Sequence, residues 1–231
     1  MKDFPKVSPL RILEKSAHRA LGKGNLGVLV ARAGVGKTAC LVHIAFDKLF
    51  RKERLIHISL EDIPEKVTSY YNVIYYDLVK GLGLKGEDES KMLIDRNRMI
   101  LAYLNQSFST ARLRRNMNNL AEKIDFTPDA LIVDGLDFSK TSAETFQDLK
   151  KLAGEFQVEI WFSALSPLGI PETDEGGIPQ PCVHVADQCS IMVQLLPTPS
   201  ALFLKLLKDH ENPVLPDTHV RLDPNTFLVM D

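Results

Sequence analysis

The stretch VLVARAGVGKTACLVHIAF, residues 28–46, constrains the fold of this 231-residue chain more than any other. It joins a run of apolar residues to a glycine-bearing loop, and apolar residues at helical spacing follow the loop. A strand that passes through a tight turn into a helix is typical of proteins in which strands and helices alternate. The sequence therefore predicts an α/β protein, with a strand over 27–31 and a helix from Gly36 to about Phe50.

Strand and helix patterns continue to alternate along the chain. We expect further strands over 54–61, 98–105, 129–135 and 158–165, helices over 8–20, 64–86, 110–124 and 142–156, a polar loop at 85–90, and three β-like runs at 190–196, 201–208 and 226–231. The alternation indicates a mainly parallel sheet covered on both faces, and the final runs without helices predict antiparallel strands added at the C-terminal edge. We interpret 1–231 as one domain, with 1–22 as an N-terminal helical segment and 166–181 as a Pro/Gly-rich loop.

Composition narrows the classes of protein to which the chain can belong. Apolar residues make up 45% and charged residues 25%, as in ordinary globular proteins, and the net charge of −2 provides no overall positive field for nucleic acid. The three cysteines match no disulfide or metal-binding spacing. The sequence lacks a secretory signal pattern and a membrane-length apolar run, so we expect a cytoplasmic protein with no membrane partner.

The loop ARAGVGKT at 31–38 matches the pattern G-x-x-x-x-G-K-[ST], except that Ala31 stands at the first glycine. In this pattern backbone N–H groups surround a nucleotide phosphate, the lysine reaches the β- and γ-phosphates, and the hydroxyl binds Mg²⁺. The alternative is an incidental turn between a strand and a helix. We assign nucleotide contact to seven residues, namely Ala33, Gly34, Val35, Gly36, Lys37, Thr38 and Ala39.

Two strand ends supply carboxylates for such a site. Asp134, which ends the strand within DALIVDG, is expected to hold the magnesium water shell with Thr38, and Asp137 is a less favoured substitute. In many P-loop ATPases an acid that orients water follows this aspartate, but here the next residue is Gly135. Glu61, at the end of HISLE, lies at the same predicted edge of the sheet and is our candidate base. A turn-capping aspartate and a solvated glutamate remain the alternatives.

Together these residues resemble the RecA-like P-loop ATPases, particularly the DnaB-type helicase and KaiC-type branches. ARAGVGKTA begins with Ala-Arg, as DnaB-type loops often do; ISLED is similar to the strand whose glutamate activates water, and LIVDGLD to the strand whose aspartate binds the metal. The resemblance implies a three-layer RecA-like fold from about residue 24, binding of ATP and Mg²⁺, and hydrolysis with Glu61 and Lys37 as catalytic residues. It also implies a homo-oligomer, as a ring or filament, and a protein partner that the sequence does not name.

The chain departs from that family at two positions. Ala164 stands where a glutamine usually senses the γ-phosphate, and His210 stands where an arginine usually reaches the nucleotide of a neighbouring subunit, although Lys205 and Lys208 are retained. Such an arginine contributes roughly 10³–10⁵ in rate. Two functions therefore stay open: a slow Mg-dependent ATPase that controls assembly or a partner, and a nucleotide-dependent regulator that does not hydrolyse.

The arginine-rich stretch 110–124 adds a third, less favoured function. Arg112, Arg114 and Arg115 would suit the lid of a P-loop small-molecule kinase, although a solvated helix face is the usual reason for such a run. The same arginines would form a local basic patch. Only Tyr103 and Phe108 are near them in sequence to stack on bases, so nucleic-acid binding is not favoured.

Overall fold

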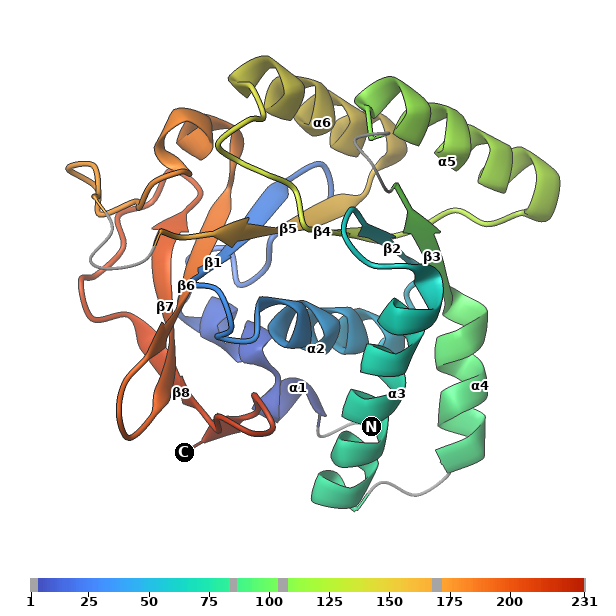
Figure 1. The fold of residues 1–231 in the computed structure, drawn as a ribbon, viewed down its shortest axis with the longest axis horizontal. Coiled ribbons are helices and arrows are strands. Elements are labelled where there is room, and N and C mark those ends of the chain that lie inside the picture. Colours follow the sequence, from blue (N-terminus) through green and yellow to red (C-terminus); the bar gives the residue numbers. More distant parts are fainter. Residues whose placement is uncertain (1–3, 84–86, 104–107, 168–171, 231) are drawn as a thin grey trace.

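The chain forms three layers, with helices packed on both faces of a mostly parallel sheet (Figure 1). The computed structural model describes residues 4–83, 87–103, 108–167 and 172–230. The strands are β1 (Leu26–Ala31), β2 (Leu55–Ser59), β3 (Arg98–Ala102), β4 (Ala130–Asp134), β5 (Glu159–Leu165), β6 (Ile191–Pro197), β7 (Leu202–Asp209), β8 (His219–Leu222) and β9 (Val229–Met230). The helices are α1 (Phe4–Val7), α2 (Lys37–Phe50), α3 (Pro64–Leu82), α4 (Glu87–Asn97), α5 (Thr110–Ile124) and α6 (Ala143–Phe156), with 3-10 helices η1 (Pro9–Lys15) and η2 (Val183–Gln188).

The strands lie in the order β3-β2-β4-β5-β1-β6-β7-β8-β9. Strands β1 to β6 are parallel, and β7, β8 and β9 are antiparallel additions at one edge. This confirms the predicted α/β class with a mainly parallel sheet. The expectation that all three final runs are antiparallel was wrong for β6, which pairs with β1 in parallel. The segment containing η2 supplies the crossover that a parallel connection requires.

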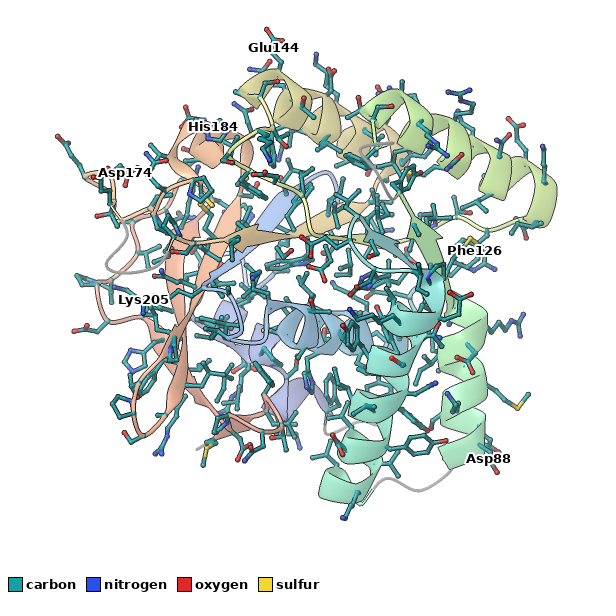
Figure 2. The ribbon with its side chains drawn as sticks, viewed as in Figure 1. Asp88, Phe126, Glu144, Asp174, His184 and Lys205 are labelled. Atoms are coloured by element: carbon teal, nitrogen blue, oxygen red, sulfur yellow. The ribbon has the colours of Figure 1, made fainter. Side chains whose placement is uncertain are left out.

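Both faces of the central strands are covered, which explains their continuous apolar runs. Figure 1 shows α5 and α6 on one face and α1 to α4 on the other. Along β1, Leu26, Val28 and Val30 belong to the core beneath α5 and α6, whereas Leu29 and Ala31 belong to the core against α2. Figure 2 shows the side chains of both layers, with Glu144 on α6 and Asp88 on α4 at opposite sides of the molecule.

Trp161 on β5 is completely buried, as its place in a predicted strand indicated. It lies directly opposite Gly27 of β1 in the strand register. A Cβ atom at position 27 would lie 2.7 Å from the Trp161 Cε3 atom, so glycine is the residue that admits the indole ring. The close pair holds β1 and β5 in one relative position near the start of β1.

The helix expected at 8–20 was wrong in its extent. The chain forms α1 and η1 instead, with Ser8 accepting a hydrogen bond from the Leu10 amide at 3.3 Å as the N-cap. Helical structure ends at Lys15, so 16–22 is not part of an N-terminal helical segment. The Ser16 hydroxyl and the Ala17 amide donate to Asp209 at 2.6 and 2.7 Å, which holds this backbone against the end of β7.

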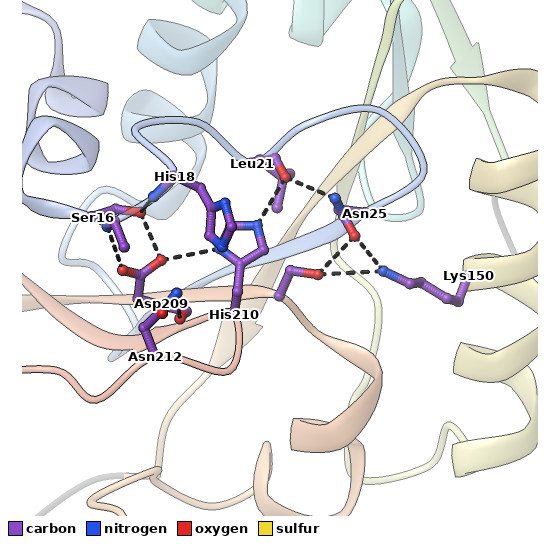
Figure 3. A network of polar contacts seen from close by, with 10 residues as sticks. Ser16, His18, Leu21, Asn25, Lys150, Asp209, His210 and Asn212 are labelled. Atoms are coloured by element: carbon purple, nitrogen blue, oxygen red, sulfur yellow. Dashed lines mark hydrogen bonds and ion pairs between the residues drawn. The ribbon is translucent and has the colours of Figure 1, made fainter.

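A polar network joins this N-terminal segment to the edge of the sheet (Figure 3). The His210 ring contacts Asp209 Oδ1 through Nδ1 at 3.0 Å, and its Nε2 atom lies 3.2 Å from the Leu21 carbonyl oxygen. The rings of His18 and His210 have centroids 4.2 Å apart. Lys150 and Ser190 both donate to Asn25 Oδ1 nearby, which ties α6 to the start of β1.

Two other elements differ from the sequence prediction. The polar loop expected at 85–90 lies partly outside the described residues, and from Glu87 onward it is the first turn of α4. Acidic residues are favourable at a helix N-terminus, so the polar composition of this stretch does not oppose a helix. Strand β8, with the sequence HVRL, was not predicted. Among the described helices, none combines the length and the apolar composition required to cross a membrane.

Candidate functional site

The glycine-bearing loop lies where β1 ends and α2 begins, at the carboxyl edge of the parallel strands. Gly34 and Gly36 both adopt left-handed backbone conformations, with φ of 75° and 98°. Residues with a side chain rarely adopt such angles, and glycine adopts them freely. Gly36 is also the N-cap of α2, so its conformation determines how the loop enters the helix.

Most backbone amides of this loop have no hydrogen-bond partner among the described residues. Among the amides from Ala33 to Ala39, only that of Val35 donates to another described residue, the Arg32 carbonyl at 3.4 Å. Regular helical bonding of α2 begins with the Cys40 amide, which donates to the Gly36 carbonyl at 2.9 Å. Unpaired amides at the start of a 14-residue helix form a favourable site for an anion.

The two predicted metal ligands are in direct contact. Thr38 Oγ1 donates a hydrogen bond of 2.7 Å to Asp134 Oδ2, although the residues lie on α2 and β4, with β5 between β1 and β4 in the sheet. Hydroxyl and carboxylate oxygens suit Mg²⁺, which usually takes one or two protein ligands together with water and phosphate. Over the described part of the chain, no cluster of three or more His, Cys, Asp or Glu side chains could hold a metal ion by itself. A metal at Thr38 and Asp134 would therefore depend on ligands from a bound nucleotide and water.

Ser163 is a site residue that sequence reasoning missed. It lies on β5 with 2% exposure, donates to Asp134 Oδ1 at 2.5 Å and accepts from the Gly135 amide at 3.1 Å. Each oxygen of the Asp134 carboxylate thus accepts a hydrogen bond from a hydroxyl. The available signal was a lone hydroxyl residue in the apolar run EIWFSAL, one strand from the strand that ends in aspartate.

Glu61 lies beside Asp134 because β2 and β4 are neighbours. Ser59 is opposite Asp134 in the register, and the Leu60 amide donates to the Asp134 carbonyl at 3.0 Å. The exposed Glu61 side chain then packs on Gly135, where an added Cβ would be 2.8 Å from Glu61 Cγ. With a φ of 87° and this close neighbour, a residue with a side chain at position 135 would have a strained backbone and would displace Glu61.

Asp137 does not share this arrangement. Its exposed carboxylate accepts from the Ser139 hydroxyl at 2.6 Å and pairs with Lys140 at 2.9 Å. The hydrogen bond from Ser139 and the ion pair with Lys140 hold the pKa of Asp137 below its usual value. The geometry thus groups Thr38, Asp134 and Glu61, and Asp137 interacts within its own loop.

A buried histidine lies near this group. His57 on β2 is fully buried, and its Nδ1 atom is 3.1 Å from the Tyr71 hydroxyl, while its Nε2 atom has no partner among the described residues. Burial lowers the pKa of His57 to about 4, against the opposing effect of the Asp134 charge. His57 is therefore neutral at physiological pH, as expected for a core histidine.

The residues at the positions expected for a γ-phosphate sensor and an arginine finger are buried in the core or bond to other groups of this chain. Ala164 is fully buried in the apolar core beneath α5 and α6. Lys208 donates to the Ala186 carbonyl at 2.7 Å, and His210 pairs with Asp209 at the opposite edge of the sheet from the loop. Lys205 lies on β7 and lines a shallow surface cavity of about 290 Å³ (Figure 2).

The arginines of α5 form the side of a packed helix. Arg114 pairs with Glu155 of α6, with Nε and Oε2 2.9 Å apart, and the Arg112 guanidinium lies 5.2 Å from the centre of the Tyr103 ring. Leu113 on the same helix is fully buried against the sheet. This helix is anchored at both its apolar and its charged faces, which does not favour a role as a kinase lid.

Comparison of the chain with models of known protein families found no match, and comparison with curated proteins found no relative. The proposed function is therefore argued from the residues of the loop and of the strand ends, and not from similarity to known proteins.

Proposed function

We propose that this chain is a RecA-like P-loop protein that binds Mg-ATP, hydrolyses it slowly and uses the nucleotide to control its own assembly or a partner. The observation on which the proposal rests is the 2.7 Å contact between Thr38 and Asp134 at the N-terminus of α2. A hydroxyl and a carboxylate brought together from distant parts of the chain, beside a loop of unpaired amides, are the parts that a nucleotide–magnesium site requires. The three-layer α/β arrangement is compatible with this family.

Each residue has a defined role in the proposed site. The loop amides and the Lys37 ammonium group bind the phosphates, and Thr38 and Asp134 hold the metal with its water shell. A bound Mg²⁺ would neutralise charge on the β- and γ-phosphate oxygens. Glu61, next to Asp134 through Gly135, orients the attacking water and accepts its proton.

Slow turnover follows from the groups that the site lacks. The Ala164 side chain offers no polar atom to contact the γ-phosphate, and Lys208 and His210 bond within the chain. Charge that develops in the transition state therefore has no arginine to balance it from these positions, a loss of roughly 10³–10⁵ in rate. We also propose that the protein is cytoplasmic and assembles as a homo-oligomer, in a ring or filament.

The lack of a polar side chain at position 164 favours a second candidate, a nucleotide-dependent regulator that does not hydrolyse ATP. Ser163, the polar residue next to Ala164, uses its hydroxyl on Asp134 and the Gly135 amide. If no group on β5 responds to the γ-phosphate, binding and release alone would drive the change of state.

Mg-ATP affinity and phosphate release, measured for the wild type, Lys37→Ala and Glu61→Gln, test the proposal. Lys37→Ala should weaken binding roughly 10- to 100-fold through loss of a charged hydrogen bond. Glu61→Gln should keep the affinity and lose phosphate release. Lys140→Ala and Glu65→Gln are matched controls because both side chains are exposed and belong to neighbouring segments.

Unchanged Mg-ATP affinity in Lys37→Ala would remove the proposal. Equal phosphate release from the wild type and Glu61→Gln would favour the non-hydrolysing regulator. The assay is repeated across protein concentration, because turnover that rises faster than linearly shows that a second copy completes the site.

A further inference from the structure

The turn between β8 and β9 holds an aromatic residue in an unusual conformation. Asp223 Oδ1 accepts from the amides of Asn225 and Thr226, each at 2.8 Å, and the Asp223 carbonyl accepts from the Phe227 amide at 2.8 Å. Phe227 has a left-handed backbone with φ of 56°. A residue with a bulky side chain adopts such a backbone only where its surroundings compensate for it.

Phe227 contacts the phosphate loop directly. A Cβ atom added to Gly36 would lie 2.2 Å from Phe227 Cζ and 2.8 Å from Cε1, so the edge of the ring is against the Gly36 α-carbon. The same ring stacks on His43 of α2, with centroids 6.2 Å apart and an interplanar angle of 28°. Phe4 of α1 also stacks on His43, at 6.3 Å and 11°.

This contact restricts Gly36, a loop residue without a side chain. Gly36 without a neighbour would sample right- and left-handed backbone conformations about equally, and only one of them presents the loop amides as they stand here. The Phe227 ring occupies the space beside its α-carbon, while His43, which is buried and neutral, supports the ring from the second turn of α2. Binding a phosphate to a loop that is already arranged costs less conformational entropy.

We propose that Phe227 is a positioning residue for the phosphate loop, through which the β8–β9 hairpin and nucleotide binding are coupled. The inference rests on the proposed function, because it presumes that the loop binds a triphosphate. On this proposal the turn at 223–228 supports nucleotide binding indirectly, through Gly36, and does not contact the nucleotide. Because coupling is reciprocal, a triphosphate on the loop should also stabilise the hairpin.

The test compares the binding of Mg-ATP and of Mg-tripolyphosphate, which has no base or sugar, to four proteins. These are the wild type, Phe227→Ala, Phe227→Tyr and Phe203→Ala. Phe203→Ala is the matched control, since Phe203 is a half-buried phenylalanine on β7 that packs on His219 and does not contact the loop. Phe227→Tyr keeps the ring but adds an oxygen to Cζ, the ring atom nearest Gly36.

Phe227→Ala should weaken both ligands by the same factor, about tenfold for a loss of preorganisation, and Phe227→Tyr should weaken both as well. Phe203→Ala should leave both affinities unchanged. Amide exchange in 223–230 should slow when either ligand binds to the wild type, a response that a merely structural role for Phe227 would not give.

Three outcomes would overturn the inference. A loss for Mg-ATP alone would mean that the ring contacts the base, wild-type affinity in both Phe227 variants would mean that the loop holds its own conformation, and exchange unaffected by ligand would mean that the hairpin is not coupled. Failure of the proposed function gives a different result, in which the wild type binds neither ligand.

Discussion

The Asp134 carboxylate is oriented by two hydroxyl groups from different elements. Thr38 holds Oδ2 and Ser163 holds Oδ1, so the carboxylate cannot turn without breaking a hydrogen bond. Thr38 could be assigned from the loop pattern alone. Ser163 acts only through Asp134 and becomes visible once β5 is known to lie beside β4.

Ser163→Ala should raise the Mg²⁺ concentration needed for half-maximal ATP binding by about tenfold, because a hydrogen bond to a charged group is lost and the Gly135 amide loses its acceptor. A Mg²⁺ titration at a fixed concentration of fluorescent ATP analogue measures this. Ser139→Ala removes a similar hydrogen bond, to Asp137, and should leave the midpoint unchanged. Equal midpoints for both variants would show that Asp134 needs no such support.

Two buried histidines should make the protein less stable in acid. Burial lowers the pKa of His43 to about 3 and that of His57 to about 4, whereas both titrate near 6.5 in an unfolded chain. Because the folded pKa is the lower one, their contribution to stability is complete above about pH 6.5 and is lost as pH falls towards the folded value. Each histidine should reduce the free energy of unfolding by about 1.4 kcal/mol per pH unit in that window.

Urea unfolding at several pH values between neutral and mildly acidic conditions measures this slope. His57→Gln should reduce the slope of the free energy of unfolding against pH by the contribution of one protonating group. His184→Gln, at an exposed position, should leave the slope unchanged. The same slope in the wild type and His57→Gln would show that His57 becomes protonated without unfolding.

At the scale of elements, local signals decided which parts of the fold were predictable. The helices α2, α5 and α6 form where the sequence placed them, and α5 and α6 begin at serines whose side chains cap the first turn. Ser142 is one such cap and accepts from the Thr145 amide at 3.3 Å. These signals lie within a few residues of each other, so the sequence alone reveals them.

Ser142→Ala should lower the free energy of unfolding by about 1 kcal/mol, the usual cost of removing an N-cap side chain. Urea denaturation measures the change, with the exposed Ser200→Ala as its control. A loss as small as that of Ser200→Ala would show that the first turn of α6 is capped by other groups.

Elements without a local signal were missed. Helix α4 is mostly polar, and of the side chains described in it only Ser90, Ile94 and Asn97 are buried, so it has too few apolar residues to show a periodic face. The non-helical backbone after Lys15 depends on Asp209, which is distant in the chain. The loop and strand-end residues of the candidate site were predictable because their patterns are local in the sequence. The contact between Phe227 and Gly36 was not, because it joins residues far apart in the chain.

At the scale of the whole molecule, Asp209 ties the N-terminal segment to the end of β7, at the opposite end of the sheet's strands from the glycine-bearing loop. It is 3% exposed and bonds with Ser16, Ala17 and His210. Burial alone would raise its pKa, but these hydrogen bonds hold the pKa of Asp209 below its usual value. The carboxylate therefore stays charged while it holds the segment.

Asp209→Ala should destabilise the protein by about 3 kcal/mol, because three donors lose a charged partner, and should speed tryptic cleavage after Arg19, which is exposed in the released segment. Urea unfolding and timed digestion measure the two effects. Asp187→Ala changes an exposed aspartate on η2 and should alter neither. Unchanged digestion at Arg19 would show that the segment is held by its apolar residues instead.

The two edge strands of the sheet differ in length, and this difference affects how copies of this protein can aggregate. At one margin lies β9, which is only two residues long and offers few free backbone groups for another strand to join. At the other lies β3, with five half-buried residues. Because unpaired strand margins are where misassembly by strand addition begins, fibrous growth from this fold would start at Arg98–Ala102, and a charged or proline substitution there is the change that would suppress it.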